Sequence, residues 1–199
     1  MQQKDLRQLK TQAKLHKAYI SLQKQGYEKL TIQQLCKEAS ITRATFYNQF
    51  QDVYELRLDL HDSLILELKK ALTIINPKPL RELKKDELDD QVVNLFHHIE
   101  QNRHAYELLL VLKPDALFMN QVKEIVKQFI IEGTNYSEAQ EQLIEGNFDF
   151  IVSFYTGAYF ESILWWIGNN YEPNAKEMSH TLIQTGLNGS IRKPIQMRE

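Results

Sequence analysis

Residues 31–50 of the chain read TIQQLCKEASITRATFYNQF, and this stretch decides the fold of the N-terminal part. Thr31 precedes Gln34 by three residues, which is the spacing of a capping box that starts a helix. Thr42 is placed to cap a second short helix after the turn Ala39-Ser40-Ile41. Two short helices joined by a turn of this length predict a helix-turn-helix element.

The second short helix is expected to have one apolar face and one polar face. The apolar residues of the element predict a small core, made of Ile32, Leu35, Ile41, Phe46 and Phe50. The candidate DNA contacts are Thr31, Thr42, Arg43, Thr45, Tyr47 and Asn48. Arg43 lies in the first helical turn, where a guanidinium can bond bidentately to a guanine edge. Hydroxyl groups and helix N-termini suit phosphate oxygens; the alternative is that the threonines act only as caps and that Tyr47 only packs.

The two signs of charge are segregated along the chain. Overall, 24 Lys and Arg residues oppose 26 Asp and Glu residues, a net charge of −2. Residues 1–50 hold nine basic and three acidic residues, a net charge of +6, and the rest of the chain holds 15 and 23, a net charge of −8. A basic head on an acidic body is typical of nucleic-acid-binding proteins. Lys10, in the basic first helix, is therefore a further candidate phosphate contact.

Composition excludes several other classes of protein. With 43% hydrophobic and 25% charged residues among 199, the chain is typical of a globular protein. The one cysteine, Cys36, excludes an intrachain disulfide framework and a Cys-rich zinc module. We expect its side chain to be core, with a redox-sensing thiol as the alternative. The N-terminus lacks the apolar region of a signal peptide, and the longest uncharged apolar stretch, 150–160, is shorter than the ~20 residues of a membrane span. We therefore expect a cytoplasmic protein with no membrane partner.

Helical periodicity continues along the whole chain without a strand pattern, so the expected fold class is all-α with about nine helices. The expected helices cover residues 6–25, 31–38, 42–49, 52–75, 86–102, 103–112, 114–132, 139–168 and 174–189, with a loop at 133–137. We predict a three-helix DNA-binding domain over residues 1–51 and a larger C-terminal helical bundle over residues 52–199.

A family motif overlaps the helix-turn-helix element. Its residues are Gly26-Tyr27, Leu30-Thr31-Ile32, Leu35-Cys36 and the run from Ala39 to Phe50, which contains a specific Thr-Phe-Tyr-x-x-Phe core. Over about residues 6–58 the chain resembles the DNA-binding domain of the TetR family of bacterial transcriptional regulators. This resemblance implies a homodimer that binds a palindromic operator through the second short helix. It also implies a C-terminal domain for dimerisation and for a small-molecule effector that releases the DNA, as in a repressor.

The chain departs from the family pattern at three positions. Ser40 stands where the family usually has Gly, so the turn must tolerate a side chain there. Cys36 replaces a common Ala. Val53 stands in place of the usual Lys, which removes one expected phosphate contact; the basic first helix, with Arg7, Lys10 or Lys14, is the expected compensation.

The segment 148–166 is the most aromatic in the chain and permits two interpretations. Since a helix that is apolar nearly all round must be buried, it packs on the core and on a dimer partner. Alternatively, some of its aromatic residues line an effector pocket, for which the candidates are Phe154, Tyr155, Tyr159 and Trp166. The resemblance implies a four-helix dimer bundle from the last two helices, with Gly157, Trp165, Met178, Leu182 and Ile183 as candidate members. The C-terminal domain also resembles the family branch that contains dihydroxyacetone-kinase regulators.

The sequence contains no catalytic constellation, so we expect no enzymatic activity and no cofactor. His97, Glu100 and His104 are spaced to share a helical face, but Asn102 marks a helix break between them, and we expect no metal site. Two alternatives to a repressor remain open: a transcriptional co-activator, and a helical protein-interaction adaptor that binds no specific DNA sequence. The absence of the usual Lys at Val53 favours the adaptor.

Overall fold

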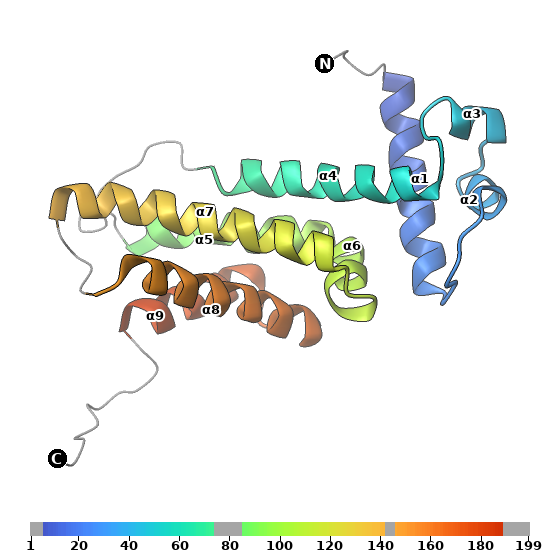
Figure 1. Ribbon diagram of the computed structural model, residues 1–199. Helices are drawn as coiled ribbons and strands as arrows, with labels where there is room; N and C mark the ends of the chain where they lie inside the picture. Colours follow the sequence, from blue (N-terminus) through green and yellow to red (C-terminus); the bar gives the residue numbers. More distant parts are fainter. Residues whose placement is uncertain (1–5, 74–84, 142–145, 189–199) are drawn as a thin grey trace.

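The computed structural model describes residues 6–73, 85–141 and 146–188, and within these ranges the chain is helical and has no strand (Figure 1). The all-α prediction is therefore confirmed. The helices are α1 (Leu6–Lys24), α2 (Ile32–Glu38), α3 (Arg43–Tyr47), α4 (Val53–Ala71), α5 (Lys85–Gln101), α6 (Arg103–Glu107), α7 (Ala116–Glu141), α8 (Phe148–Gly168) and α9 (Ala175–Asn188), with a π-helical segment, η2 (Leu108–Leu112), after α6. Within the described ranges, none of the helices combines the length and hydropathy that crossing a membrane requires.

Helices α1 to α3 form a head at one end of the molecule (Figure 1). The buried residues of α1 are the ones that helical spacing predicts: Leu15, Ala18, Tyr19 and Leu22. Helix α1 ends as expected at Gly26, whose φ of 92° is a left-handed conformation that glycine adopts without strain. The Tyr27 N–H donates to the Leu22 carbonyl, which completes a Schellman motif and turns the chain toward α2.

Helix α4 leaves the head and continues along the body beside α7 (Figure 1). Asp52 caps it by accepting a hydrogen bond from the Glu55 N–H at 2.8 Å. The Glu55 carboxylate in turn accepts from the N–H of Gln51, the residue before the cap. The four leucines that the sequence places at i+4 spacing, Leu56, Leu60, Leu64 and Leu68, are all buried. Because α4 contacts α1 as well as α5 and α7, it belongs to the packing of both head and body.

The body is built from two helix pairs, α5 with α9 and α7 with α8. Trp166 of α8 lies at its centre and is 0% exposed. The indole ring packs edge-on against Phe96 of α5 and Tyr171, with centroid distances of 5.1 and 5.0 Å. Its N–H donates to the Pro173 carbonyl at 2.6 Å, so the polar end of the buried ring is satisfied.

The predicted loop at 133–137 is wrong, because α7 continues as helix to Glu141. The residue on which that prediction depended, Gly133, lies inside the helix. One glycine in a helix interior costs only about 1 kcal/mol relative to alanine, which the packing of a long helix against its neighbours offsets. The predicted helix that starts at Ala139 therefore starts later, at Phe148.

The predicted helix over 103–112 is α-helical only as far as Glu107 and continues as η2. Pro114 has no N–H, so it cannot continue the normal ladder of backbone hydrogen bonds. The Lys113 N–H donates instead to the Leu108 carbonyl at 2.8 Å, and the Asp115 N–H donates to the Leu109 carbonyl at 2.8 Å. These two hydrogen bonds span five and six residues instead of four. They end the helix and turn the chain into α7.

The end of α1 is attached to the body by two lysines. Lys24 Nζ of α1 lies 2.7 Å from the Glu107 carboxylate of α6. Lys113 Nζ, which follows η2, donates to the Gln23 side chain at 2.7 Å and to the Tyr27 carbonyl at 3.0 Å. The position of α1, and with it that of the head, is therefore linked to the η2 region.

Candidate nucleic-acid interface

Both short helices of the head begin at threonine caps, as predicted. The Thr31 hydroxyl accepts from the Gln34 N–H at 3.2 Å, and Gln34 Oε1 accepts from the Thr31 N–H at 2.9 Å, which is a complete capping box. Thr42 caps α3 by accepting from the Thr45 N–H at 3.1 Å. These bonds fix where α2 and α3 start and therefore which side chains lie in their first turns.

The turn between α2 and α3 depends on Ser40, which has a φ of +54°. The N–H groups of Ser40 and Ile41 donate to the carbonyls of Lys37 and Cys36, at 3.2 and 3.0 Å. This pattern ends α2 with a left-handed residue, the position that glycine fills without strain. The turn therefore tolerates the Ser40 side chain, although a left-handed backbone conformation is unfavourable for a residue with a Cβ.

Phe46 sets the orientation of α3. It is 0% exposed and packs against Phe50, with ring centroids 5.9 Å apart. The predicted small core is present: Leu35, Phe46 and Phe50 are buried, and Ile32 and Ile41 are half-buried against them. Burying this face of α3 leaves Arg43 and Tyr47 exposed on the opposite side.

Arg43 and Tyr47 interact across one turn of α3. Hydrogen bonding with the neighbouring Tyr47 side chain raises the pKa of the Arg43 guanidinium above its ordinary value. Tyr47 is 51% exposed. Arg43 therefore presents an exposed guanidinium beside its i+4 neighbour, at the helix end that can enter a DNA groove.

The other candidate contacts of α3 differ in the exposure and the hydrogen bonding of their polar groups. The Thr45 hydroxyl lies 2.8 Å from the Thr42 hydroxyl, so these two groups are joined to each other. Asn48 is exposed at the C-terminal end of α3, where its backbone N–H donates to the Ala44 carbonyl. Thr42 is exposed and Thr45 is half-buried, so Thr42 offers the more accessible hydroxyl.

The basic N-terminal half of α1 lies beside the end of α3 (Figure 1). Gln49 Nε2 donates to the Gln8 carbonyl of α1 at 3.1 Å, which joins the two segments directly. Lys10 and Lys14 of α1 are exposed. The structure thus brings the predicted cationic residues of α1 close to the predicted recognition helix.

The start of α4 contains one exposed residue that the sequence interpretation missed. Val53 is half-buried and packs against the core, so it offers no charge at the position where the family has Lys. The next residue, Tyr54, is 58% exposed, with the Arg57 guanidinium 5.6 Å from its ring centroid. An aromatic residue in the first turn of a capped helix, next to Val53, was the signal that could have identified it.

Cys36 is a core residue of the head. It is 5% exposed, and burial raises the pKa of its thiol above the ordinary value. A buried, protonated thiol reacts slowly, so the geometry favours the packing role over redox sensing.

The aromatic residues predicted to line an effector pocket do not lie on one surface. Phe154 is 60% exposed, whereas Trp166 is buried in the core. The Tyr155 hydroxyl donates to the Gly186 carbonyl of α9 at 3.1 Å. Tyr159 is half-buried, and burial raises its pKa to about 12. Phe154 instead shares an exposed side of α8 with Phe150 and Trp165, which are 69% and 57% exposed.

The candidate dimer residues also divide into two groups. Trp165 and Gly157 of α8 are exposed. The α9 candidates Met178, Leu182 and Ile183 are buried within their own chain, where α9 packs on α5 and α8. Of the five candidates, these three therefore pack within one chain, whereas Trp165 and Gly157 lie on its surface.

The histidines considered as metal ligands lie on different helices. His97 of α5 is 3.6 Å from the Glu100 carboxylate, and His104 of α6 is 3.3 Å from Lys24 Nζ. Asn102 separates the two helices, as the sequence suggested. In the parts of the chain that the structure describes, no group of three His, Cys, Asp or Glu residues is arranged to hold a metal ion.

Comparisons with known proteins agree with this geometry. The family described as bacterial regulatory proteins, tetR family, matches residues 15–60, and a transcriptional regulator C-terminal region matches residues 86–186. No curated protein matched the chain. Among solved structures, a TetR transcriptional regulator from Streptococcus agalactiae is 20% identical, with a TM-score of 0.62 over 90% of this chain and 95% of that one. The "putative fatty acid metabolism regulator" of Clostridium perfringens is 14% identical, with a TM-score of 0.68 over 90% of this chain and 100% of that one.

The two family matches cover both parts of the molecule. One contains the capped helix-turn-helix of the head, and the other covers the helices of the body. The chain belongs to the TetR family of bacterial transcriptional regulators.

Proposed function

We propose that this transcriptional regulator is a homodimeric repressor that binds a palindromic operator and releases it when a small-molecule effector binds the body. The observation that carries the DNA-binding part is the orientation of α3. Phe46 is buried, so Arg43 and Tyr47 point away from the head on its exposed face. The proposed DNA contacts are Lys10, Thr31, Thr42, Arg43, Thr45, Tyr47 and Asn48, with Tyr54 added.

Arg43 is proposed to read a base edge, and the hydroxyls to position the head on phosphates. Thr31 and Thr42 are exposed as well as being helix caps, so capping and phosphate contact are compatible. Lys10 adds a cation near the end of α3, in partial compensation for the uncharged Val53.

The proposed dimer contact is the exposed apolar side of α8. Phe150, Phe154 and Trp165 are each more than half exposed, which is unusual for three large apolar side chains on one helix face. Gly157 lies between them and has no atom within 4 Å of the place where a Cβ would be, so a second helix can approach closely there. A second copy of this chain would cover the same patch on both protomers.

We propose two domains. Residues 1–51 bind DNA, and residues 52–199 form the dimer and bind the effector. The effector contacts expected from the sequence were Phe154, Tyr155, Tyr159 and Trp166. We further propose a cytoplasmic regulator that needs no metal, no cofactor and no enzymatic activity. A protein-interaction adaptor is the second candidate, because Val53 packs on the core and supplies no phosphate contact.

Selection of bound sequences from random DNA duplexes, followed by footprinting, tests the proposal. We expect an enriched palindrome whose half-sites are separated by one helical turn of DNA, or a multiple of it, because each head of a dimer reads one half-site. Enrichment of no sequence at moderate salt would favour the adaptor. A single unpaired half-site would contradict the homodimeric mode.

A further inference from the structure

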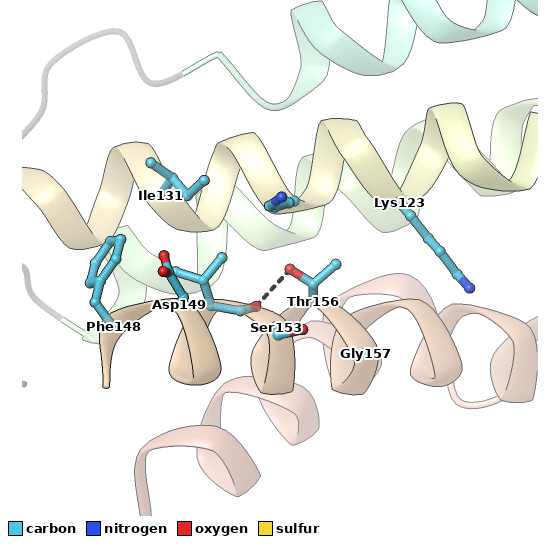
Figure 2. A pocket seen from close by; sticks show the side chains of 9 residues that line it. Lys123, Ile131, Phe148, Asp149, Ser153, Thr156 and Gly157 are labelled. Carbon is cyan, nitrogen blue, oxygen red and sulfur yellow. Dashed lines mark hydrogen bonds between the residues drawn. The ribbon is translucent and has the colours of Figure 1, made fainter. Parts of the chain in front are cut away.

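A groove lies on the body between α7 and α8, away from the DNA-binding head (Figure 2). Its volume of about 490 Å³ lies within the range of small-molecule sites. Helix α7 contributes Lys123, Lys127 and Ile131, and the start of α8 contributes Phe148, Asp149 and Ser153. Nothing in the sequence predicted this groove, because its two sides come from helices that only tertiary packing brings together.

The two ends of the groove differ in chemistry. Ile131 and Phe148 lie at one end, and Lys123 lies toward the other end with Gly157 (Figure 2). Lys123 and Ile131 are two helical turns apart on α7, which corresponds to about 12 Å along the helix axis. Asp149 lies beside Phe148, so the first end combines an apolar surface with one carboxylate, whereas the other end is cationic (Figure 2). The distance between the two ends corresponds to the length of a medium-chain organic acid.

The charge of the groove is positive. Lys123 and Lys127 are both exposed, and Asp149 is the one acidic residue among the described lining residues. Lys123 Nζ lies 4.5 Å from the centroid of the Phe160 ring, a cation–π contact that places the ammonium group against α8. Two ammonium groups beside an apolar surface match an anionic head group with an apolar tail.

The aromatic residues of α8 offer less to a ligand than these lysines do. The Trp166 N–H is donated to the Pro173 carbonyl, and the Tyr155 hydroxyl is donated to the Gly186 carbonyl. The Thr156 hydroxyl, in the groove itself, is donated to the Val152 carbonyl at 2.7 Å. These donors are already used inside the chain, whereas the two lysines that line the groove each have an ammonium group with three donors.

We infer that the effector site of this regulator is the α7–α8 groove, and that it takes an amphipathic carboxylate, with the carboxylate at Lys123 and Lys127 and the alkyl chain toward Ile131 and Phe148. The inference rests on the proposed function, since it names the site and the class of the proposed effector. Helix α7 contacts α4, and α4 contacts α1 of the head, so ligand-induced movement of α7 has a path of direct contacts to the DNA-binding helices.

Calorimetric titration of the full chain with sodium decanoate, below its micelle concentration, tests the site. We expect saturable binding of decanoate and weaker binding of decan-1-ol, which has the same chain without the charge. The double variant Lys123→Gln/Lys127→Gln should weaken decanoate binding by about tenfold or more, because it removes both charge-assisted contacts. Lys176→Gln, on the exposed side of α9, is the matched control and should leave binding unchanged.

A second pair of variants tests the position of the ligand. Ser153 is exposed in the groove, so Ser153→Trp can fill the space without disturbing the core. We expect Ser153→Trp to abolish decanoate binding and Ser153→Ala to retain it, with unfolding temperatures close to wild type in both.

Several outcomes would overturn the inference. Binding that does not saturate, or that is equal in the wild type and the double lysine variant, excludes the proposed site. If decanoate does not bind and Ser153→Trp changes the sedimentation coefficient, the groove is instead a contact between two copies. A gel-shift assay on the selected operator separates the ligand site from the proposed release of DNA. If decanoate binds in a lysine-dependent way but leaves the DNA complex intact, the site is supported and effector release is contradicted.

Discussion

Arg57 Nη2 of α4 lies 2.8 Å from Oδ2 of Asp115, the residue directly before α7. The other oxygen of the same carboxylate accepts hydrogen bonds from the N–H groups of Leu117 and Phe118 and so caps α7. His61 is fully buried beside this pair, with Nε2 3.6 Å from Asp115 Oδ2, and burial lowers the pKa of its imidazole. One carboxylate thus starts α7 and holds it against α4, the helix that also contacts the head.

Two substitutions separate these roles of Asp115. Asp115→Asn keeps a capping oxygen and removes the charge, so it should lower the free energy of unfolding by about 1 kcal/mol, because Arg57 is partly screened by solvent. Asp115→Ala also removes the cap and should cost about 2 kcal/mol. Urea unfolding measures both, with Glu124→Ala on the exposed side of α7 as control. Equal losses for Asn and Ala would show that the cap contributes nothing.

The left-handed conformation of Ser40 predicts a stabilising substitution. Ser40→Gly should raise the free energy of unfolding by up to about 1 kcal/mol, because glycine adopts this φ without strain, although its freer unfolded chain offsets part of the gain. Ser40→Ala is the matched control: it keeps a Cβ and should give no gain. Thermal unfolding of the three proteins measures the effect, and a gain with Ala equal to that with Gly would exclude backbone strain as its source.

Buried His98 predicts a loss of stability in mild acid. Its Nε2 lies 3.0 Å from the Tyr106 hydroxyl, and burial lowers the pKa of the imidazole to about 4. Because this value lies below the unfolded value of about 6.5, the unfolded state takes up the proton first as pH falls. The contribution of His98 to stability is therefore unchanged above pH 6.5 and falls by about 3 kcal/mol between pH 6.5 and 4.

Urea unfolding at a series of pH values checks this prediction. His98→Gln should be less stable than wild type at pH 7 but lose less stability on acidification. His97→Gln, at the exposed neighbouring position, should follow the wild-type pH dependence. Parallel curves for wild type and His98→Gln would remove His98 as the source of acid sensitivity.

Arg43→Ala should weaken binding to the selected operator by about 1–3 kcal/mol and relax the preference at one base position, because a bidentate base contact is lost. Arg43 is fully on the surface of α3, so the fold should be unaffected. Gel-shift titrations against operators with single base changes measure both effects, with Lys176→Ala as a surface control. Unchanged affinity and preference would exclude Arg43 from base readout.

The exposed apolar side of α8 predicts how the dimer can be broken. Phe154→Glu should convert the protein to a monomer at micromolar concentration, because it places a charge in the proposed contact without touching the core. Leu66→Glu introduces the same change at a residue of α4 that is 53% exposed, and it should leave the dimer intact. Sedimentation velocity measures both, and a monomeric wild type would overturn the dimer proposal.

The head could be predicted from sequence in some detail because its structure depends on short-range rules. The Thr31–Gln34 capping box and the Thr42 cap each depend on groups three residues apart. Phe46 follows from the apolar spacing of one short helix. At Ser40 the family resemblance indicated only that the turn must tolerate a side chain, and the structure adds its left-handed backbone conformation. The exposed Tyr54 was missed because its exposure depends on how α4 crosses the head.

The body could be predicted only in outline. Its helices were recognised, but the length of α7 was not, because packing along a long helix outweighs the weak preference of Gly133 for a break. Helix α8 is apolar on nearly all sides, so its sequence does not indicate which side is buried within the chain. The same ambiguity placed Met178, Leu182 and Ile183 at a dimer surface, whereas they pack inside one chain.

The sequence by itself determined that the protein is all-α, where its head begins and ends its helices, and which family it resembles, since periodicity, caps and a contiguous motif are local properties of the chain. The tertiary structure alone decided which aromatic residues of α8 are core and which are exposed, how Arg57 meets Asp115, and that Lys123, Lys127 and Phe148 line one groove. Those relationships join residues far apart in the chain, and their geometry depends on how whole helices cross.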